Sequence, residues 1–130
     1  MNGNVLVDTS VWINYFQKAN RDLSEKLENL LSDSQIFVPK IVIAGLIQGA
    51  HSEKEIAVIA NFLDAFKIVD QKEDTWLKAG KLSFGIRKKG KSVNLIDCYI
   101  AVIAKEHRCS IYTLDRHFND ISKELGIKLL

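Results

Sequence analysis

The stretch NVLVDTSVWINYFQ, residues 4–17, decides the fold class. Residues 4–7 form a short apolar run, which is typical of a strand buried on both faces of a sheet. Asp8 ends this run, and residues 10–17 then have the composition of a helix, with Ser10 as the expected N-cap. The chain therefore opens with a buried strand that leads directly into a helix.

The same alternation of strand and helix continues along the chain. Further strands are expected at 35–39, 67–70, 110–115 and 127–130, and helices at 21–32, after Pro39, and at 53–66, 73–89, 95–107 and 118–125. Short apolar strands that alternate with helices indicate a parallel sheet covered on both faces. The sequence therefore predicts one α/β domain over residues 1–130, a three-layer α/β/α sandwich with a short, mainly parallel central sheet. Trp12 and Trp76 lie on apolar helix faces and are expected in its core.

Composition is that of an ordinary globular protein, with 47% hydrophobic and 26% charged residues in a chain of 130. Cys98 and Cys109 have no CxxC spacing, so we interpret them as reduced thiols of a cytoplasmic protein. The start of the chain lacks the basic and apolar regions of a signal peptide. No apolar run approaches the roughly 18 residues that span a bilayer, so no membrane association is expected.

Basic residues cluster between Asp74 and Asp97, where no acidic residue occurs. Six local positive charges suit a polyanion such as RNA. An ordinary solvated helix end would carry the same charges, so both interpretations stay open. The expected contacts to RNA phosphates are at the end of the predicted helix: Arg87, Lys88, Lys89 and Lys91.

Three aspartates are expected at the edge of the sheet where ligands gather, outside the carboxyl ends of the strands. Asp8 and Asp115 end predicted strands, and Asp97 opens a predicted helix. Carboxylates that gather in this way repel one another, and a cation between them makes the cost tolerable. Hard ions such as Mg²⁺ prefer oxygen ligands. A metal held there can activate water and stabilise charge on a phosphodiester.

Each aspartate also has a purely structural interpretation. Asp8 could cap the helix that follows it. Asp97 could be a first-turn acid that the helix dipole favours, and Asp115 could form a turn through its own side chain. Taken singly these signals are weak, but three together in a domain with a basic flank favour a metal site.

The helix after Pro39 carries the weakest helix former at its middle. In IVIAGLIQGA, residues 41–50, Gly45 interrupts an apolar block, at a cost of about 1 kcal/mol relative to alanine. One explanation is packing, because Gly45 and Gly49 lie four residues apart on one face and would allow another helix to approach closely.

Four segments in order resemble a PIN domain of the VapC toxin type: VLVDTSVWINYF (5–16), VPKIVIAGLIQGA (38–50), LIDCYIAVIA (95–104) and TLDRHF (113–118). The resemblance implies an α/β/α fold and a Mg²⁺- or Mn²⁺-dependent endoribonuclease toxin that cleaves RNA. It also implies a partner antitoxin and a homodimer. By position, Asp8, Asp97 and Asp115 correspond to the family's acidic metal ligands. Ser10 and Thr113 are then expected to orient waters or a ligand beside them.

The resemblance gives Gly45 a second explanation, which we favour. Family members usually carry a metal-binding glutamate at this position, and glutamate is a good helix former. The chain is therefore expected to be an impaired nuclease. His117 is another departure, since many members have an acid there, and it is a candidate substrate contact. The alternative function is a non-catalytic PIN fold that binds RNA or an antitoxin; a phosphoacceptor receiver domain is disfavoured because its extra acidic pair and its lysine are missing.

Overall fold

The computed structural model describes residues 3–130, in which four strands alternate with seven helices. The strands pair in the order β3-β2-β1-β4, and all three pairs are parallel. The elements are β1 (Asn4–Val7), α1 (Thr9–Gln17), α2 (Arg21–Asp33), β2 (Gln35–Pro39), α3 (Lys40–Gln48), α4 (Glu53–Leu63), β3 (Lys67–Val69), α5 (Thr75–Lys88), α6 (Leu95–Glu106), β4 (Ser110–Tyr112) and α7 (Phe118–Leu125).

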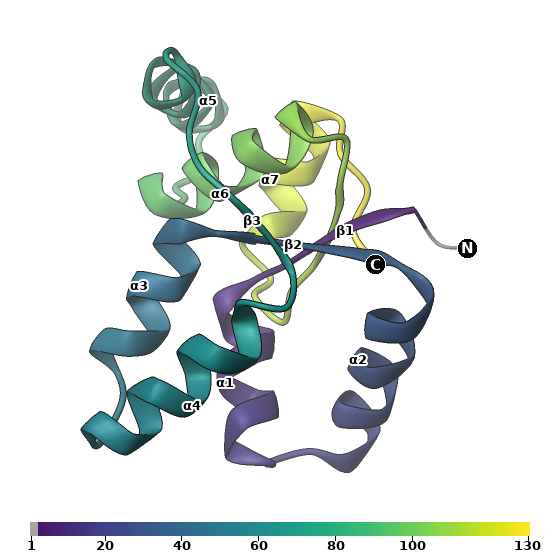
Figure 1. Ribbon diagram of the computed structural model, residues 1–130. Helices are drawn as coiled ribbons and strands as arrows, with labels where there is room; N and C mark the ends of the chain where they lie inside the picture. Colours follow the sequence, from purple (N-terminus) through teal and green to yellow (C-terminus); the bar gives the residue numbers. More distant parts are fainter. Residues whose placement is uncertain (1–2) are drawn as a thin grey trace.

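The helices cover both faces of the sheet. Helices α1 to α4 lie on one side, and α5, α6 and α7 lie on the other (Figure 1). Within the layers, α5 packs against α6 and α7, while α1 packs against α2 and α3. The predicted three-layer α/β/α sandwich with a parallel central sheet is therefore confirmed.

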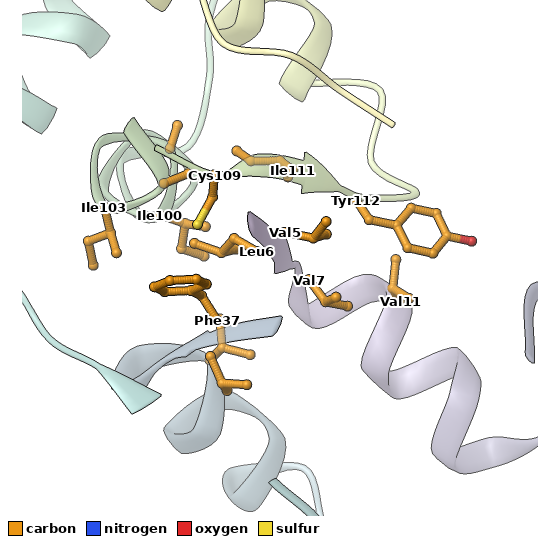
Figure 2. Close-up of a cluster of buried hydrophobic side chains, with 14 of the residues drawn as sticks. Val5, Leu6, Val7, Val11, Phe37, Ile100, Ile103, Cys109, Ile111 and Tyr112 are labelled. Atoms are coloured by element: carbon orange, nitrogen blue, oxygen red, sulfur yellow. The ribbon is translucent and has the colours of Figure 1, made fainter. Parts of the chain in front are cut away.

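Strand β1 lies inside the sheet, which explains why its sequence is apolar on both faces. Val5, Leu6 and Val7 are fully buried. Leu6 lies on the side of Phe37 and Ile100, whereas Val5 and Val7 point the opposite way (Figure 2). Because side chains alternate along a strand, each helix layer receives apolar contacts from β1.

Two predicted strands at the end of the chain are shorter than expected. The strand predicted at 110–115 ends at Tyr112, so Asp115 lies in the loop before α7 rather than at a strand end. Beyond Tyr112 the backbone donates to side chains instead of to a neighbouring strand: the Leu114 amide donates to Ser10 Oγ. The segment predicted as a strand at 127–130 contributes only an isolated bridge between Ile111 and Leu129.

The two tryptophans have different environments. Trp12 is fully buried, as predicted. The prediction for Trp76 was wrong: its side chain is 41% exposed and stacks on Tyr99, with ring centroids 4.0 Å apart. The buried face of α5 is centred on Thr75, Ala79 and other residues one helical turn apart, and Trp76 is rotated about 100° away from Thr75.

The cysteines are free and buried, as expected for reduced core thiols. Burial raises the pKa of Cys98 to about 11 and that of Cys109 to about 12, so both thiols stay protonated near neutral pH. Among the described residues, no helix combines the length and the apolar character that crossing a membrane requires.

Candidate active site

Three separate elements bring Asp8, Asp97 and Asp115 into electrostatic contact. Asp8 follows β1, Asp97 lies in the first turn of α6, and Asp115 lies in the loop between β4 and α7. Burial raises the pKa of the Asp97 carboxyl to about 6, and the negative charges of Asp8 and Asp115 add to the rise, whereas His117 opposes it. Asp8 and Asp115 thus lie near enough to Asp97 for their charges to act on its carboxyl.

Asp8 is the anchored member of the group. Its side chain is only 4% exposed. Its Oδ2 accepts hydrogen bonds from Ser10 Oγ at 2.8 Å and from Thr113 Oγ1 at 2.9 Å. Oδ2 also accepts a longer bond, 3.4 Å, from the Ser10 amide, so Asp8 rather than Ser10 is the N-cap of α1. The capping interpretation of Asp8 is therefore correct, but all these bonds use one oxygen and leave Oδ1 without a donor among the described residues.

Thr113 links two of the aspartates. While its hydroxyl donates to Asp8, its Oγ1 accepts from the Asp115 amide at 3.0 Å. Asp115 Oδ1 in turn accepts from the His117 amide at 2.9 Å and lies 3.0 Å from His117 Nδ1. The turn interpretation of Asp115 is thus also correct. Ser10 and Thr113 fix the orientation of the Asp8 carboxylate and the path of the loop that carries Asp115.

Replacing Thr113 with valine is expected to lower the free energy of unfolding by about 1–3 kcal/mol, because the buried Asp8 carboxylate loses a donor. Urea denaturation monitored by circular dichroism measures the loss. Thr113→Ser keeps the hydroxyl and is the matched control, for which we expect a much smaller change. No loss of stability in Thr113→Val, or a loss no larger than in Thr113→Ser, would mean that the hydrogen bond to Asp8 contributes no more than the methyl group does.

The donor set suits a hydrated hard cation. Among residues 3–130 no three His, Cys, Asp or Glu side chains lie close enough together to form a ready-made metal site. Mg²⁺ retains several waters and is commonly held by one or two carboxylates, so a fully enclosing protein cage is unnecessary. Asp97 accepts no hydrogen bond from the described residues and is repelled by its neighbours. A divalent ion would relieve that repulsion, and three oxygen-bearing side chains are chemically suitable for it.

Gly45 lies in α3 beside this region. A Cβ added to Gly45 would meet only the Cγ2 of Thr9, at 3.9 Å, an ordinary contact. A cavity of about 290 Å³ is lined by Gly45 together with Thr9 and Ile96, the sequence neighbours of Asp8 and Asp97. The packing explanation for Gly45 is therefore wrong, because no helix within residues 3–130 approaches this position closely enough to require glycine.

The predicted RNA-binding residues divide into two pairs. Arg87 and Lys88 each lie 5.7 Å from the centroid of the exposed Phe84 ring. The other two form ion pairs with α7: Lys89 Nζ lies 2.7 Å from Glu124 and Lys91 Nζ lies 3.1 Å from Asp120. The sequence could not reveal this partial neutralisation, since both acidic partners come about 30 residues later in the chain.

Comparison with known proteins gives a consistent family assignment. The PIN domain model matches residues 5–124. Ribonuclease VapC1 of Methanocaldococcus jannaschii is 29% identical over 125 residues, which cover 96% of this chain and 85% of that protein. Among solved structures, DNA-bound VapBC from Salmonella typhimurium has a TM-score of 0.81 at 22% identity, with 98% of this chain and 96% of that chain covered. VapBC-5 from Mycobacterium tuberculosis, a member of the VapBC family of toxin-antitoxin systems, has a TM-score of 0.69 at 20% identity, with 100% and 98% covered.

Proposed function

The chain belongs to the PIN-domain family, and from that premise we propose that it is a metal-dependent endoribonuclease toxin that cleaves RNA phosphodiester bonds. One observation carries this function: Asp97 is a partly buried carboxyl whose charge is opposed by Asp8 and Asp115, two carboxylates from other elements. Structural ion pairing would bring opposite charges together, whereas a cation site needs like charges that face one another. The ribonuclease name of the relative from Methanocaldococcus jannaschii supports the same activity.

The site residues would have distinct roles. Asp8, Asp97 and Asp115 would hold Mg²⁺ or Mn²⁺ through carboxylate oxygens. When bound, such an ion supplies activation of water and stabilisation of charge on the phosphodiester oxygens. Ser10 and Thr113 hold Asp8 by its Oδ2, which keeps Oδ1 available for a ligand.

Two further groups would contact the substrate. His117 is 68% exposed and lies against Asp115, so its ring can meet a substrate at the edge of the site. Arg87 and Lys88 keep charges that no acidic side chain of the described residues neutralises, and they would bind RNA phosphates. Lys89 and Lys91 would contribute less, because Glu124 and Asp120 already pair with them.

Gly45 would impair this activity. The resemblance to VapC toxins gives this position a metal-binding glutamate, and the space around Gly45 admits a side chain next to Thr9. Loss of a group that only supports a metal ligand commonly costs about 10- to 100-fold in metal affinity or activity, and loss of a ligand should cost at least as much.

Titration calorimetry with Mg²⁺ separates the nuclease from the alternative, a PIN fold that only binds RNA or an antitoxin. The nuclease is expected to bind Mg²⁺ through its carboxylates, so replacing Asp115 with asparagine should weaken binding by about tenfold or more. Asp33→Asn, at the end of α2, is the matched control and should leave binding unchanged. A chain that shows no Mg²⁺ binding and no Mg²⁺-dependent RNA cleavage would be the binding module instead.

A partner antitoxin and a homodimer complete the proposed function, and a toxin that acts on cellular RNA would work in the cytoplasm. A groove of about 610 Å³ between α1, α2 and α4 has apolar walls, including Phe16 and Phe62, and Val58 on its rim is 56% exposed. Lys18, Arg21 and Glu28 line the same groove, so it would suit an antitoxin segment with apolar side chains flanked by charges of both signs. The dimer would use exposed apolar side chains on α5 and at the start of α6: Leu77, Phe84, Leu95 and Ile96.

A further inference from the structure

Two cavities follow the junction between α5 and α7, and lysines line both. The larger is about 610 Å³ and also borders the end of α6; the smaller is about 210 Å³, and Glu124 lines both. Three acidic side chains face this junction: Glu106, Asp120 and Glu124. We call the two cavities together the lysine groove, which is defined by Lys72, Lys78, Lys81 and Lys105 in the larger cavity and by Lys89, Lys91 and Lys123 in the smaller.

One flank of α5 forms a wall of the groove. Lys78, Lys81, Gly85 and Lys89 are spaced three or four residues apart, so they lie along the same side of the helix. Gly85 faces Glu124 of α7: a Cβ added there would lie 3.4 Å from Glu124 Oε2. Lys81 lies four residues after exposed Leu77 and three residues before exposed Phe84, so this flank adjoins the proposed dimer surface along α5.

The larger cavity is the more basic part of the groove. Lys72 and Lys81 form no ion pair with any of residues 3–130, and Lys105 Nζ donates to the carbonyl oxygen of Leu125 at 2.9 Å rather than to an acid. Lys78 pairs with exposed Asp74 at 3.4 Å, and exposed pairs of this kind neutralise each other weakly.

The acidic side chains of the groove are already engaged. Glu106 accepts hydrogen bonds from the fully buried Thr75 hydroxyl at 3.0 and 3.1 Å. Glu124 and Asp120 pair with Lys89 and Lys91 in the smaller cavity. Thr75 is a neutral donor, so Glu106 keeps its negative charge. Lys72, Lys81 and Lys105 outnumber that one charge, and the larger cavity keeps a positive balance that can attract an external polyanion.

Helices α6 and α7 connect the groove with the region of the aspartates. Helix α7 starts just after Asp115 and reaches the larger cavity at Glu124. Helix α6 carries Asp97 in its first turn and Lys105 eight residues later, a distance of about 12 Å along the helix. A strand whose scissile phosphate lies at the aspartates would meet the lysines within a few nucleotides.

We propose that the lysine groove binds the phosphate backbone of the RNA substrate outside the cleavage site. The inference rests on the proposed ribonuclease function and extends it to residues beyond the basic end of α5. Lysine is a compact point charge that carries no sequence information, so this contact would raise affinity without selecting bases. An extended row of cations suits a chain of phosphates better than a single small anion, since each lysine can meet a different phosphate.

The test measures binding apart from cleavage. Fluorescence anisotropy with a labelled single-stranded RNA of about 16 nucleotides, in EDTA and over a series of salt concentrations, gives the affinity and its salt dependence. Replacing both Lys72 and Lys81 with alanine should weaken binding about tenfold and reduce the slope of log K against log salt by about 1.4, roughly 0.7 for each lost phosphate contact. The matched control replaces two exposed lysines elsewhere, Lys54 on α4 and Lys67 on β3, with alanine and should leave the slope unchanged.

Three results would overturn the proposal. One is an equal loss of RNA affinity in the Lys72/Lys81 and Lys54/Lys67 double variants, because the total charge of the protein rather than the groove would then determine binding. An unchanged affinity in the Lys72/Lys81 variant would likewise overturn the proposal, because these lysines would then not contact RNA. The third is tighter binding of a polyglutamate peptide than of RNA, with a loss of affinity for that peptide when Lys72 and Lys81 are replaced. That result would assign the groove to an acidic protein segment. RNA cleavage by a Gly45→Glu variant is measured separately, so failure of the nuclease function and failure of the groove give different outcomes.

Discussion

Replacing Gly45 with glutamate is expected to raise Mg²⁺-dependent RNA cleavage by about 10- to 100-fold. The backbone of α3 admits the new side chain, because the added Cβ meets only the Cγ2 of Thr9 at 3.9 Å. The cavity beside Gly45 is also lined by Thr9 and Ile96, the sequence neighbours of Asp8 and Asp97, so the new side chain would enter the region between the elements that carry these two acids. The measurement is the rate of cleavage of a labelled RNA, with Mg²⁺ and with EDTA.

Two matched variants separate the carboxylate from its side effects. Gly45→Ala supplies the Cβ and a gain of about 1 kcal/mol in helix propensity, and it should stabilise the protein without restoring cleavage. Gly45→Gln has nearly the shape of glutamate but no charge, and it should also remain poorly active. If glycine, alanine, glutamine and glutamate variants cleave RNA at the same rate, the account of Gly45 as a lost metal ligand is wrong.

The sequence was sufficient to predict the elements that depend only on their own residues. The buried strand β1 was recognisable because a strand inside a parallel sheet must be apolar on both faces, and Val5, Leu6 and Val7 satisfy that requirement. The end of β4 was not recognisable, because Ser10, about 100 residues earlier, supplies the hydroxyl that accepts the Leu114 amide. Such an acceptor is visible only once the fold has brought β1 and β4 together.

The candidate site shows the same division. The sequence indicated Asp8, Asp97 and Asp115 because strand and helix ends converge on one sheet edge. It could not indicate that Thr113 also holds Asp8, or that Lys89 is paired with Glu124, since each of those contacts joins distant segments. The lysine groove depends on Lys105 and Lys123, which lie outside the basic cluster of the sequence and join it only through packing of α5 against α6 and α7.

Replacing Asp97 with asparagine is expected to stabilise the metal-free protein at pH 7 while removing its response to Mg²⁺. Burial raises the pKa of Asp97 to about 6 from an ordinary value of 3.8, and the charges of Asp8 and Asp115 add to this. The folded state therefore binds the Asp97 proton more tightly than the unfolded state does. The contribution of Asp97 to the stability of the folded protein is therefore greatest below about pH 4, and it is lost as the pH rises through about 6.

The size of the effect follows from the same shift. Each unit of pKa corresponds to about 1.4 kcal/mol, so a rise of about two units sets an upper limit near 3 kcal/mol. Asp97 is only partly buried, and solvent screening lowers the expected gain to about 1–2 kcal/mol. Urea denaturation at pH 7 measures this gain, and at about pH 4, where Asp97 is protonated in the folded protein, the difference should shrink.

The sign of the change distinguishes a cation site from a structural acid. If Asp97 only complements the dipole of α6, its replacement should destabilise the protein by about 0.3–1 kcal/mol. Asp22, an exposed first-turn acid of α2, is the matched control, and Asp22→Asn should show that small loss. Mg²⁺ should raise the stability of the parent chain by mass action and leave that of Asp97→Asn nearly unchanged. A loss of stability at Asp97 equal to that at Asp22 would mean that the three carboxylates do not repel one another, and a shared cation would then have no electrostatic reason to bind between them.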